Sequence, residues 1–258
     1  MIVVDIIGLS DRIYSTNNRS NSMATLNQHY SSKTTGTTVR KTFMDREEID
    51  RAIELTSPVK RSKLVCGIGV NDCSHATLIR IDGKIVPHRA YAAWEGMIKR
   101  CYSPSTQLRN PSYIGCTVCD EWLYFSNFFK WWKNNFVEGW QLDKDLLNPG
   151  NREYSPENCL YVPRCLNAFT NDRRESKGEV LIGINWCMRG KKFTARVCTG
   201  SGERKYLGYF DSPEEAHLAW YDAKMEIAIG YKDLCDSIHP RLHSALIRKI
   251  ESMKAVAK

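Results

Sequence analysis

Two oxygen-bearing side chains flank a loop in the segment 140–163. Asp143 ends one short apolar run, and Asn158 follows a Ser-Pro-Glu turn just before a second run, Cys159 to Val162. If both runs are strands, the carboxylate and the carboxamide converge. Oxygen ligands of this kind suit a hard divalent ion such as Mg²⁺ or Mn²⁺, so the spacing indicates a metal site. The structural alternative makes Asp143 and Asp145 solvated loop carboxylates and Asn158 the cap of a helix or turn.

This segment, WQLDKDLLNPGNREYSPENCLYVP, resembles the ββα-metal finger of HNH nucleases, especially the phage homing-endonuclease branch. In that family an Asp-His pair begins the motif, and a Pro-Glu-Asn-Leu or Pro-Glu-Asn-Cys step supplies the Asn. The resemblance implies that Asp143 and Asn158 hold the metal, and that Asn167 lies where a third ligand is expected. Lys144 departs from the family pattern, in which this position holds the His that activates the attacking water. Asp143 and Asp145 beside it favour the charged lysine, which disfavours Lys144 as a base.

His88 is a second candidate for the missing base. It directly precedes a segment whose Tyr91, Trp94, Met97, Ile98 and Cys101 fall on one helical face. In the folded chain it could approach Asp143; the alternative is a hydrogen-bonded structural histidine. The pattern Trp94-x2-Met97-x2-Arg-Cys-Tyr extends the resemblance over residues 64–170.

The ten cysteines admit a zinc interpretation. The pair Cys116 and Cys119, with Cys159 and Cys165 as a second half, has the spacing of a possible Zn²⁺ site. The alternative is that the segment GCTVCDEW is a buried strand in which cysteine acts as a small hydrophobe.

The C-terminal part has a different pattern. Alternating residues predict three strands, at 182–186, 192–198 and 205–209, and Ser212, Pro213 and Glu215 predict the start of a helix through a capping box. Residues 173–258 hold 16 of the Lys and Arg residues against 11 Asp and Glu, within a net charge of +8. This bias favours a polyanionic partner.

The segment resembles the Apetala-type, or ethylene-response-factor-like, DNA-binding domain. The resemblance rests on Gly183-Ile184, Phe193-x-Ala195, Leu207-Gly208-x-Phe210 and the Pro-Glu-Glu-Ala-x2-Ala-Trp-x3-Lys helix. It implies that the sheet enters the major groove of double-stranded DNA. The implied DNA-binding residues are Asn185, Trp186, Arg189, Lys191, Lys192, Arg196, Arg204 and Lys205. Asn185 and Cys198 stand where plant members place arginines. The alternative is a solvated basic sheet face.

We therefore expect an α+β chain with four parts. They are an N-terminal arm at 1–60 with a short helix from Asp45 and a possible internal start at Met23, an HNH-like domain at 61–172, a DNA-binding domain at 173–235 and a helix at 236–258. No run approaches the length of a membrane span, and the N-terminus lacks a basic leader. The expected location is the cytoplasm, of an infected host cell if the origin is a phage.

The expected function is metal-dependent DNA cleavage of the homing type. One alternative is a degenerate DNA-binding or regulatory protein that keeps the HNH scaffold. Another is an interaction protein that binds another protein through the aromatic-rich centre.

Overall fold

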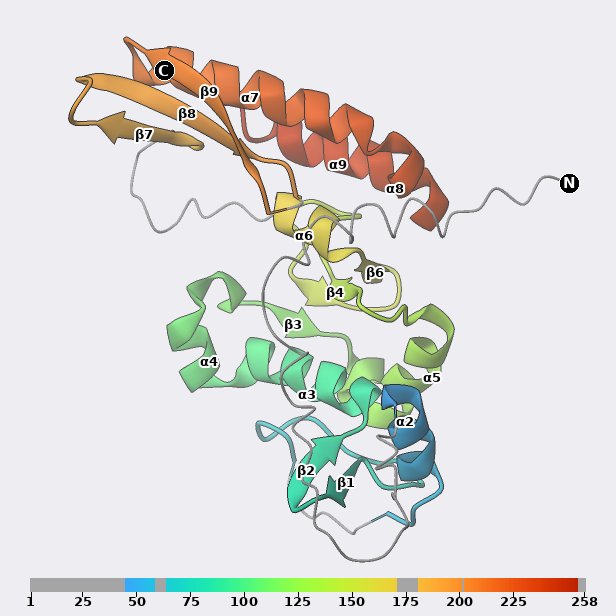
Figure 1. The fold of residues 1–258 in the computed structure, drawn as a ribbon. Coiled ribbons are helices and arrows are strands. Elements are labelled where there is room, and N and C mark those ends of the chain that lie inside the picture. Colours follow the sequence, from blue (N-terminus) through green and yellow to red (C-terminus); the bar gives the residue numbers. More distant parts are fainter. Residues whose placement is uncertain (1–44, 59–63, 171–180, 201, 255–258) are drawn as a thin grey trace, which may run out of the picture. The chain divides into compact units, whose positions relative to one another are not determined.

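The computed structural model describes residues 45–58, 64–170, 181–200 and 202–254 (Figure 1). Residues 45–258 form one compact unit. The arm at 1–44, including Met23, lies outside the described residues. Helices and sheets are mixed along the compact unit, so the predicted α+β class is confirmed.

The compact unit begins with a capped helix and a hairpin. Helix α2 (Arg46–Glu54) starts at Asp45, whose side chain accepts from the Glu48 amide while Glu48 accepts from the Asp45 amide. Strands β1 (Leu78–Ile81) and β2 (Lys84–Pro87) pair across Asp82 and Gly83, which both adopt positive φ. The sequence predicts both features, because charges and apolar residues follow Asp45 at helical spacing and Asp82-Gly83 stands between alternating apolar residues. The run LVCGIGVND from Leu64 also predicts a strand, but its first part is a tight turn with one bridge, Val65 to Gly69.

Helices α3 (Arg89–Tyr102) and α5 (Phe125–Asn135) enclose an aromatic core, and α4 (Pro104–Arg109) lies between them in sequence (Figure 1). Short 3₁₀ turns cover Pro111–Tyr113 and Asp120–Leu123. The core side chains Trp94, Trp122, Phe125 and Phe128 are fully buried or nearly so. The aromatic stripes predicted from helical spacing are therefore packing faces.

The segment 140–163 folds as strand, loop and strand, and a helix follows. Strand β4 (Gln141–Asp143) pairs antiparallel with β6 (Leu160–Val162), with Asp143 opposite Leu160. Within the loop, β5 (Glu153–Tyr154) pairs in parallel with β3 (Thr117–Val118). Helix α6 (Arg164–Thr170) comes next. The predicted strand–strand–helix order is thus present; the continuation of the helix to Lys177 falls outside the described residues.

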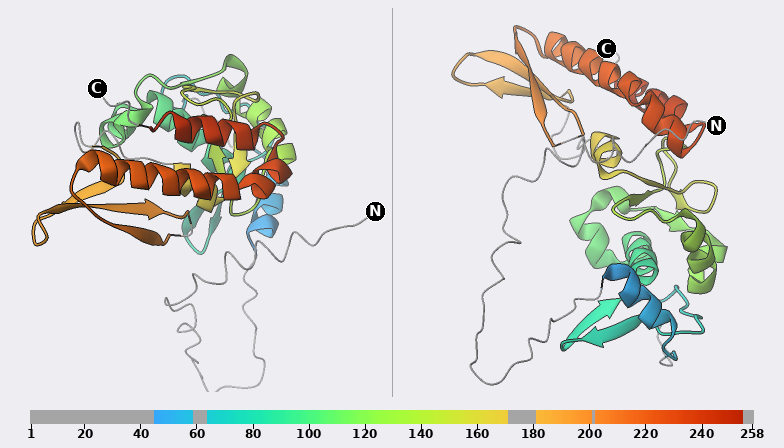
Figure 2. Two further views of the ribbon diagram at one scale, coloured as in Figure 1. Left: turned by 90° about the horizontal axis from the view of Figure 1, so that it is seen from above. Right: turned by 45° about the vertical axis from the view of Figure 1, so that its right-hand side comes forward.

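The C-terminal part is a three-stranded antiparallel sheet with three helices. Strands β7 (Ile184–Cys187), β8 (Lys192–Cys198) and β9 (Arg204–Phe210) lie in sequence order, with a bulge opposite Ala195 and Arg196. Helix α7 (Pro213–Gly230) starts at Ser212, whose hydroxyl accepts from the Glu215 amide, and packs on β8 (Figure 2).

The sequence predicts a single helix in the tail, but the structure has two. Helices α8 (Lys232–Ile238) and α9 (Leu242–Glu251) are separated at His239 and Pro240, because proline cannot continue a helix. Leu242, Leu246 and Ile250 are fully buried within the core that includes α7. The tail therefore packs on the preceding module.

One apolar core continues from the β4–β6 segment into the C-terminal part. Leu146, Val162 and Leu166 belong to the same buried cluster as Ile184, Trp220 and Leu246. Among the described helices, none has the length and apolar character that crossing a membrane requires.

Candidate functional site

Asp143 uses one carboxylate oxygen to hold its own loop. Oδ1 accepts from the amides of Asp145 at 2.9 Å and Leu146 at 2.7 Å. Burial and the charge of Asp145 raise the pKa of Asp143 above its ordinary value, against the opposing effect of Lys249. The side chain is thus a partly buried carboxylate whose negative charge is only partly compensated.

Lys144 is buried and ion-paired. Its Nζ donates to Asp145 Oδ2 at 2.9 Å and to the Asn151 carbonyl at 3.3 Å. Burial alone would lower the pKa of Lys144, but pairing with Asp145 outweighs it and raises the pKa. The ammonium therefore holds its proton at neutral pH, which argues against the predicted role as a general base.

Asn158 and Asn167 each bond to another amide side chain. Asn158 Oδ1 accepts from Asn148 Nδ2 at 2.8 Å, and Asn167 Nδ2 donates to Gln141 Oε1 at 2.7 Å. Within the described residues no hydrogen bond joins Asn158 to Asp143. The donor types suit Mg²⁺ or Mn²⁺, and the Asn158 oxygen accepts one hydrogen bond that an ion would have to share or displace.

The His88 side chain lies against α3 and α5, where it contacts Ala90, Phe129 and Trp132. It has no exposed surface, its Nδ1 accepts from the Ala90 amide at the start of α3, and its Nε2 lies 3.3 Å from Glu54. Burial lowers the pKa of His88, although Asp50 and Glu54 oppose this effect. In the described part of the chain no contact links it to Asp143, so the structural interpretation of His88 fits the geometry.

The four cysteines considered for zinc do not form a cluster. Throughout the described ranges, no three His, Cys, Asp or Glu side chains come together in a way that could hold a metal ion. Cys116 and Cys159 are buried in the aromatic core instead. The zinc interpretation thus has no support from the geometry of these residues.

The sheet β7–β9 has one face on the helices, and among the described residues no helix or strand packs on the other face. Ala195 and Val197 in β8 are fully buried in the core shared with α7. Because neighbours along a strand point to opposite faces and paired residues share a face, the register assigns the remaining positions. The outer face carries Asn185, Lys192, Arg196 and Arg204 from the predicted DNA-binding set.

The other four predicted DNA-binding residues are exposed but lie elsewhere. Arg189 and Lys191 occupy the β7–β8 turn, where Lys191 adopts positive φ. The register puts Trp186, opposite Phe193, and Lys205, opposite Val197, on the helix side of the sheet. The predicted set therefore divides into an outer face, a turn and two positions on the opposite face.

Two tyrosines complete the outer face, and the sequence interpretation missed them. Tyr206 pairs with Arg196 and Tyr209 pairs with Thr194, and the tyrosine side chains are about half exposed. Their rings are 5.8 Å apart, and the Arg196 guanidinium lies 5.8 Å from the Tyr206 ring. The signal was present in the strand alternation, but the bulge in β9 hides the register from a sequence pattern.

Comparison of the chain with protein families, with curated proteins and with solved structures finds no match in any of the three.

Proposed function

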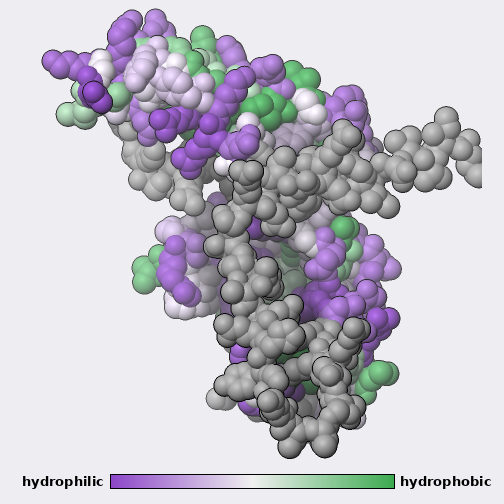
Figure 3. Space-filling view, viewed as in Figure 1, coloured by the Kyte–Doolittle hydropathy of each residue, from purple (hydrophilic) through white to green (hydrophobic). Residues whose placement is uncertain are grey.

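We propose that the chain binds double-stranded DNA through the outer face of β7–β9 and the adjoining β7–β8 turn. The observation that carries this proposal is an exposed surface on which cations and tyrosines lie together: Asn185, Arg189, Lys191, Lys192, Arg196, Arg204, Tyr206 and Tyr209. Hydrophilic side chains, drawn in purple, gather at the tip of this module (Figure 3).

The charges on this surface are largely uncompensated. Lys192 pairs with Asp211 at 2.9 Å, but both side chains are exposed, so the pair is weak. Arg189, Lys191, Arg196 and Arg204 make no ion pair with any carboxylate of the described residues. Free guanidinium and ammonium groups on an exposed surface favour binding to a phosphate backbone.

The tyrosines and Asn185 add groups that can distinguish DNA from other polyanions. A phenol hydroxyl and a carboxamide can hydrogen-bond to phosphates or base edges, and strands of an antiparallel sheet can contact base edges in a DNA groove. The resemblance of the sequence to the Apetala-type domain, in which the sheet enters the major groove, supports DNA binding by this sheet.

The test is fluorescence anisotropy with the full chain and labelled duplex DNA at several salt concentrations. The variant with Arg189, Lys191, Arg196 and Arg204 changed to Gln should lose most of its affinity at low salt. The matched control changes four exposed cations elsewhere, Lys84, Arg109, Lys130 and Arg248, to Gln and should keep it. Equal affinity of the two variants, or no binding by the wild type at low salt, contradicts the proposal.

A second candidate function is metal-dependent phosphodiester cleavage at Asp143 and Asn158. It is favoured by the strand–strand–helix order of β4, β6 and α6, and by the undercompensated charge of Asp143, which a divalent ion would relieve. We derive no hydrolytic step, because neither candidate base serves: Lys144 is held protonated by Asp145, and His88 is bound to Ala90 and Glu54.

Plasmid DNA tests the second candidate. Nicking by the wild type in Mg²⁺ or Mn²⁺, lost in both Asp143→Ala and Asn158→Ala, supports cleavage at this site. Binding of DNA without nicking in either metal leaves the binding function and removes the second candidate.

A further inference from the structure

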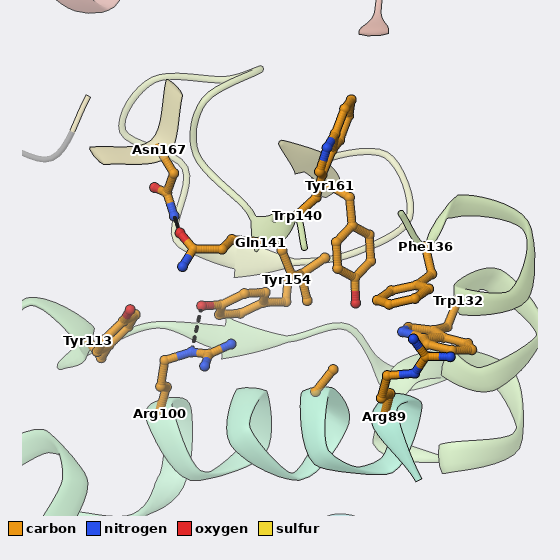
Figure 4. Close-up of a pocket in the computed structure, with 12 residues that line it drawn as sticks. Arg89, Arg100, Tyr113, Trp132, Phe136, Trp140, Gln141, Tyr154, Tyr161 and Asn167 are labelled. Carbon is orange, nitrogen blue, oxygen red and sulfur yellow. Dashed lines mark hydrogen bonds between the residues drawn. The ribbon is translucent and has the colours of Figure 1, made fainter. Parts of the chain in front are cut away.

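A cavity of about 380 Å³ lies between α3 and the strand segment β4–β6 (Figure 4). Its walls come from α3, α5, β4, β5, β6 and α6, so they are contributed by parts of the chain far apart in sequence. Half of the lining residues, all of them in the described ranges, are aromatic; two are arginines, two are amides and none is acidic. Its volume is at the small end of the range for ligand sites.

Arg100 brings an unmatched positive charge to this cavity. Its Nε donates to the Tyr154 hydroxyl at 3.0 Å (Figure 4), and its guanidinium lies 5.4 Å from the Tyr154 ring. Within the described residues it has no carboxylate partner. The other arginine of the cavity, Arg89, is paired with Asp50 and Glu138. A partly buried cation held only by neutral groups favours an anion from outside.

Two buried polar groups on the cavity wall lack hydrogen-bond partners. They are the Tyr161 hydroxyl and the Trp132 indole N–H, on side chains of residues that are each only 6% exposed. The two are neighbours, but their geometry does not amount to a hydrogen bond. In Figure 4 the Tyr161 hydroxyl points toward the space between Tyr154 and Phe136. Buried donors are rarely left unpaired, so an occupant is expected to complete them.

We propose that this cavity binds a nucleotide unit, a planar base with its phosphate. Arg100 meets the phosphate, since guanidinium forms paired hydrogen bonds to phosphate oxygens. Among the aromatic side chains that line the cavity, Tyr113 and Tyr154 provide ring surfaces for the base beside Arg100. Tyr161 and Trp132 donate to its edge, and Gln141 adds an amide at the rim.

This proposal does not depend on the DNA-binding sheet, because the residues that carry it lie in α3, α5 and β4–β6. The nucleotide unit has two possible sources, a free mononucleotide or an unpaired nucleotide within a strand. The chemistry is the same in both, and titration separates them.

Calorimetric titration of the full chain tests the proposal. The probes are inorganic phosphate, adenosine, the four deoxynucleoside monophosphates and a single-stranded thymidine trinucleotide. At least one monophosphate should bind more tightly than both phosphate and adenosine, which identifies a free nucleotide. Saturable binding of the trinucleotide alone identifies a strand. No saturable binding of any probe at millimolar concentration overturns the proposal.

Two variants locate the binding. Arg100→Met should reduce affinity for the monophosphate to that for the nucleoside. Tyr161→Phe should weaken binding about three- to tenfold, the effect of one lost hydrogen bond, while thermal stability is unchanged or raised, since the hydroxyl has no partner in the free protein. The exposed controls Arg109→Met and Tyr124→Phe should bind like the wild type. Wild-type affinity in Tyr161→Phe would place the ligand elsewhere and overturn the assignment.

Discussion

Lys249 in α9 donates a 2.7 Å hydrogen bond to Oδ1 of Asp145, which lies 104 residues earlier in the loop after β4. Lys144 occupies the other oxygen of the same carboxylate at 2.9 Å. One aspartate thus bridges two lysines and joins the last helix to the segment that carries Asp143. Burial would raise the pKa of both carboxyl groups, but the two lysines outweigh it and lower the pKa of Asp145, whereas the charge of Asp145 adds to burial and raises the pKa of Asp143.

Asp145 pairs with two lysines, so its loss should lower the free energy of unfolding more than the loss of either lysine. Asp145→Asn leaves two largely buried lysines without a carboxylate and should lower the free energy of unfolding by about 2–3 kcal/mol. Lys249→Met keeps the pair of Asp145 with Lys144 and should cost only about 1 kcal/mol. Urea unfolding measures both. Lys232→Met, which breaks an exposed pair with Asp236, is the control and should show no measurable change. A larger loss in Lys249→Met than in Asp145→Asn contradicts this account.

The same carboxylate predicts a loss of stability in acid. Burial would raise the pKa of Asp145, but Lys249 and Lys144 outweigh it and lower the pKa in the folded chain. A carboxyl group with a lowered folded pKa stabilises the protein fully above its unfolded pKa of about 3.9, and this stabilisation disappears as pH falls through the folded value. The difference in unfolding free energy between the wild type and Asp145→Asn should therefore shrink below about pH 4. A constant difference down to pH 2.5 would count against the assignment.

Asp143 should behave in the opposite way. Its pKa is raised by burial and by Asp145, so its ionised form costs stability at neutral pH, and this cost disappears as pH falls through the folded pKa. Asp143→Asn keeps an oxygen for the amides of Asp145 and Leu146 and removes the charge. The variant should unfold at a denaturant concentration equal to or higher than the wild type at pH 7. A destabilisation comparable to that of Asp145→Asn would show that the charge of Asp143 is compensated.

Local patterns predicted most of the elements correctly. Asp82-Gly83 marks the β1–β2 turn, Ser212 and Pro213 mark the start of α7, and the aromatic spacing marks α3 and α5, because each signal acts over a few neighbouring residues. The turn at Cys66 and Gly67 was missed because the apolar run around it also fits a strand.

For the candidate site at Asp143 and Asn158, the sequence predicts the positions in the chain but not the contacts of the side chains. The sequence places Asp143 and Asn158 on either side of a loop, and β4 and β6 do pair. It does not show that Asn148 would take the Asn158 oxygen, or that Lys249 would reach Asp145 from the far end. The bulge beside Arg196 likewise decides which β9 residues share its face. These contacts depend on tertiary packing, which spacing does not encode.

Gly183 is predicted to be intolerant of any side chain. It adopts φ +80°, and a Cβ there would collide with the Trp220 ring. Gly183→Ala should therefore cost about 3 kcal/mol or more through strain and overpacking. Gly230, at the end of α7, has open space and an ordinary φ, so Gly230→Ala should stabilise the chain by about 0.4–1 kcal/mol. Thermal unfolding of the pair checks both signs, and equal effects would refute the packing of Trp220 on Gly183.

The register of the sheet predicts which cations contact DNA. Arg196 lies on the outer face and Lys205 on the helix side, although both are exposed and carry the same charge. If Arg196 contacts one phosphate, Arg196→Gln should reduce the slope of log affinity against log salt concentration by about 0.9, while Lys205→Gln should leave the slope nearly unchanged. Tyr206→Ala should weaken binding without changing the slope, because it removes no charge. Anisotropy titrations between about 50 and 200 mM salt give the three slopes. A loss of slope in Lys205→Gln equal to that in Arg196→Gln would mean that DNA is held by overall charge and not by this face.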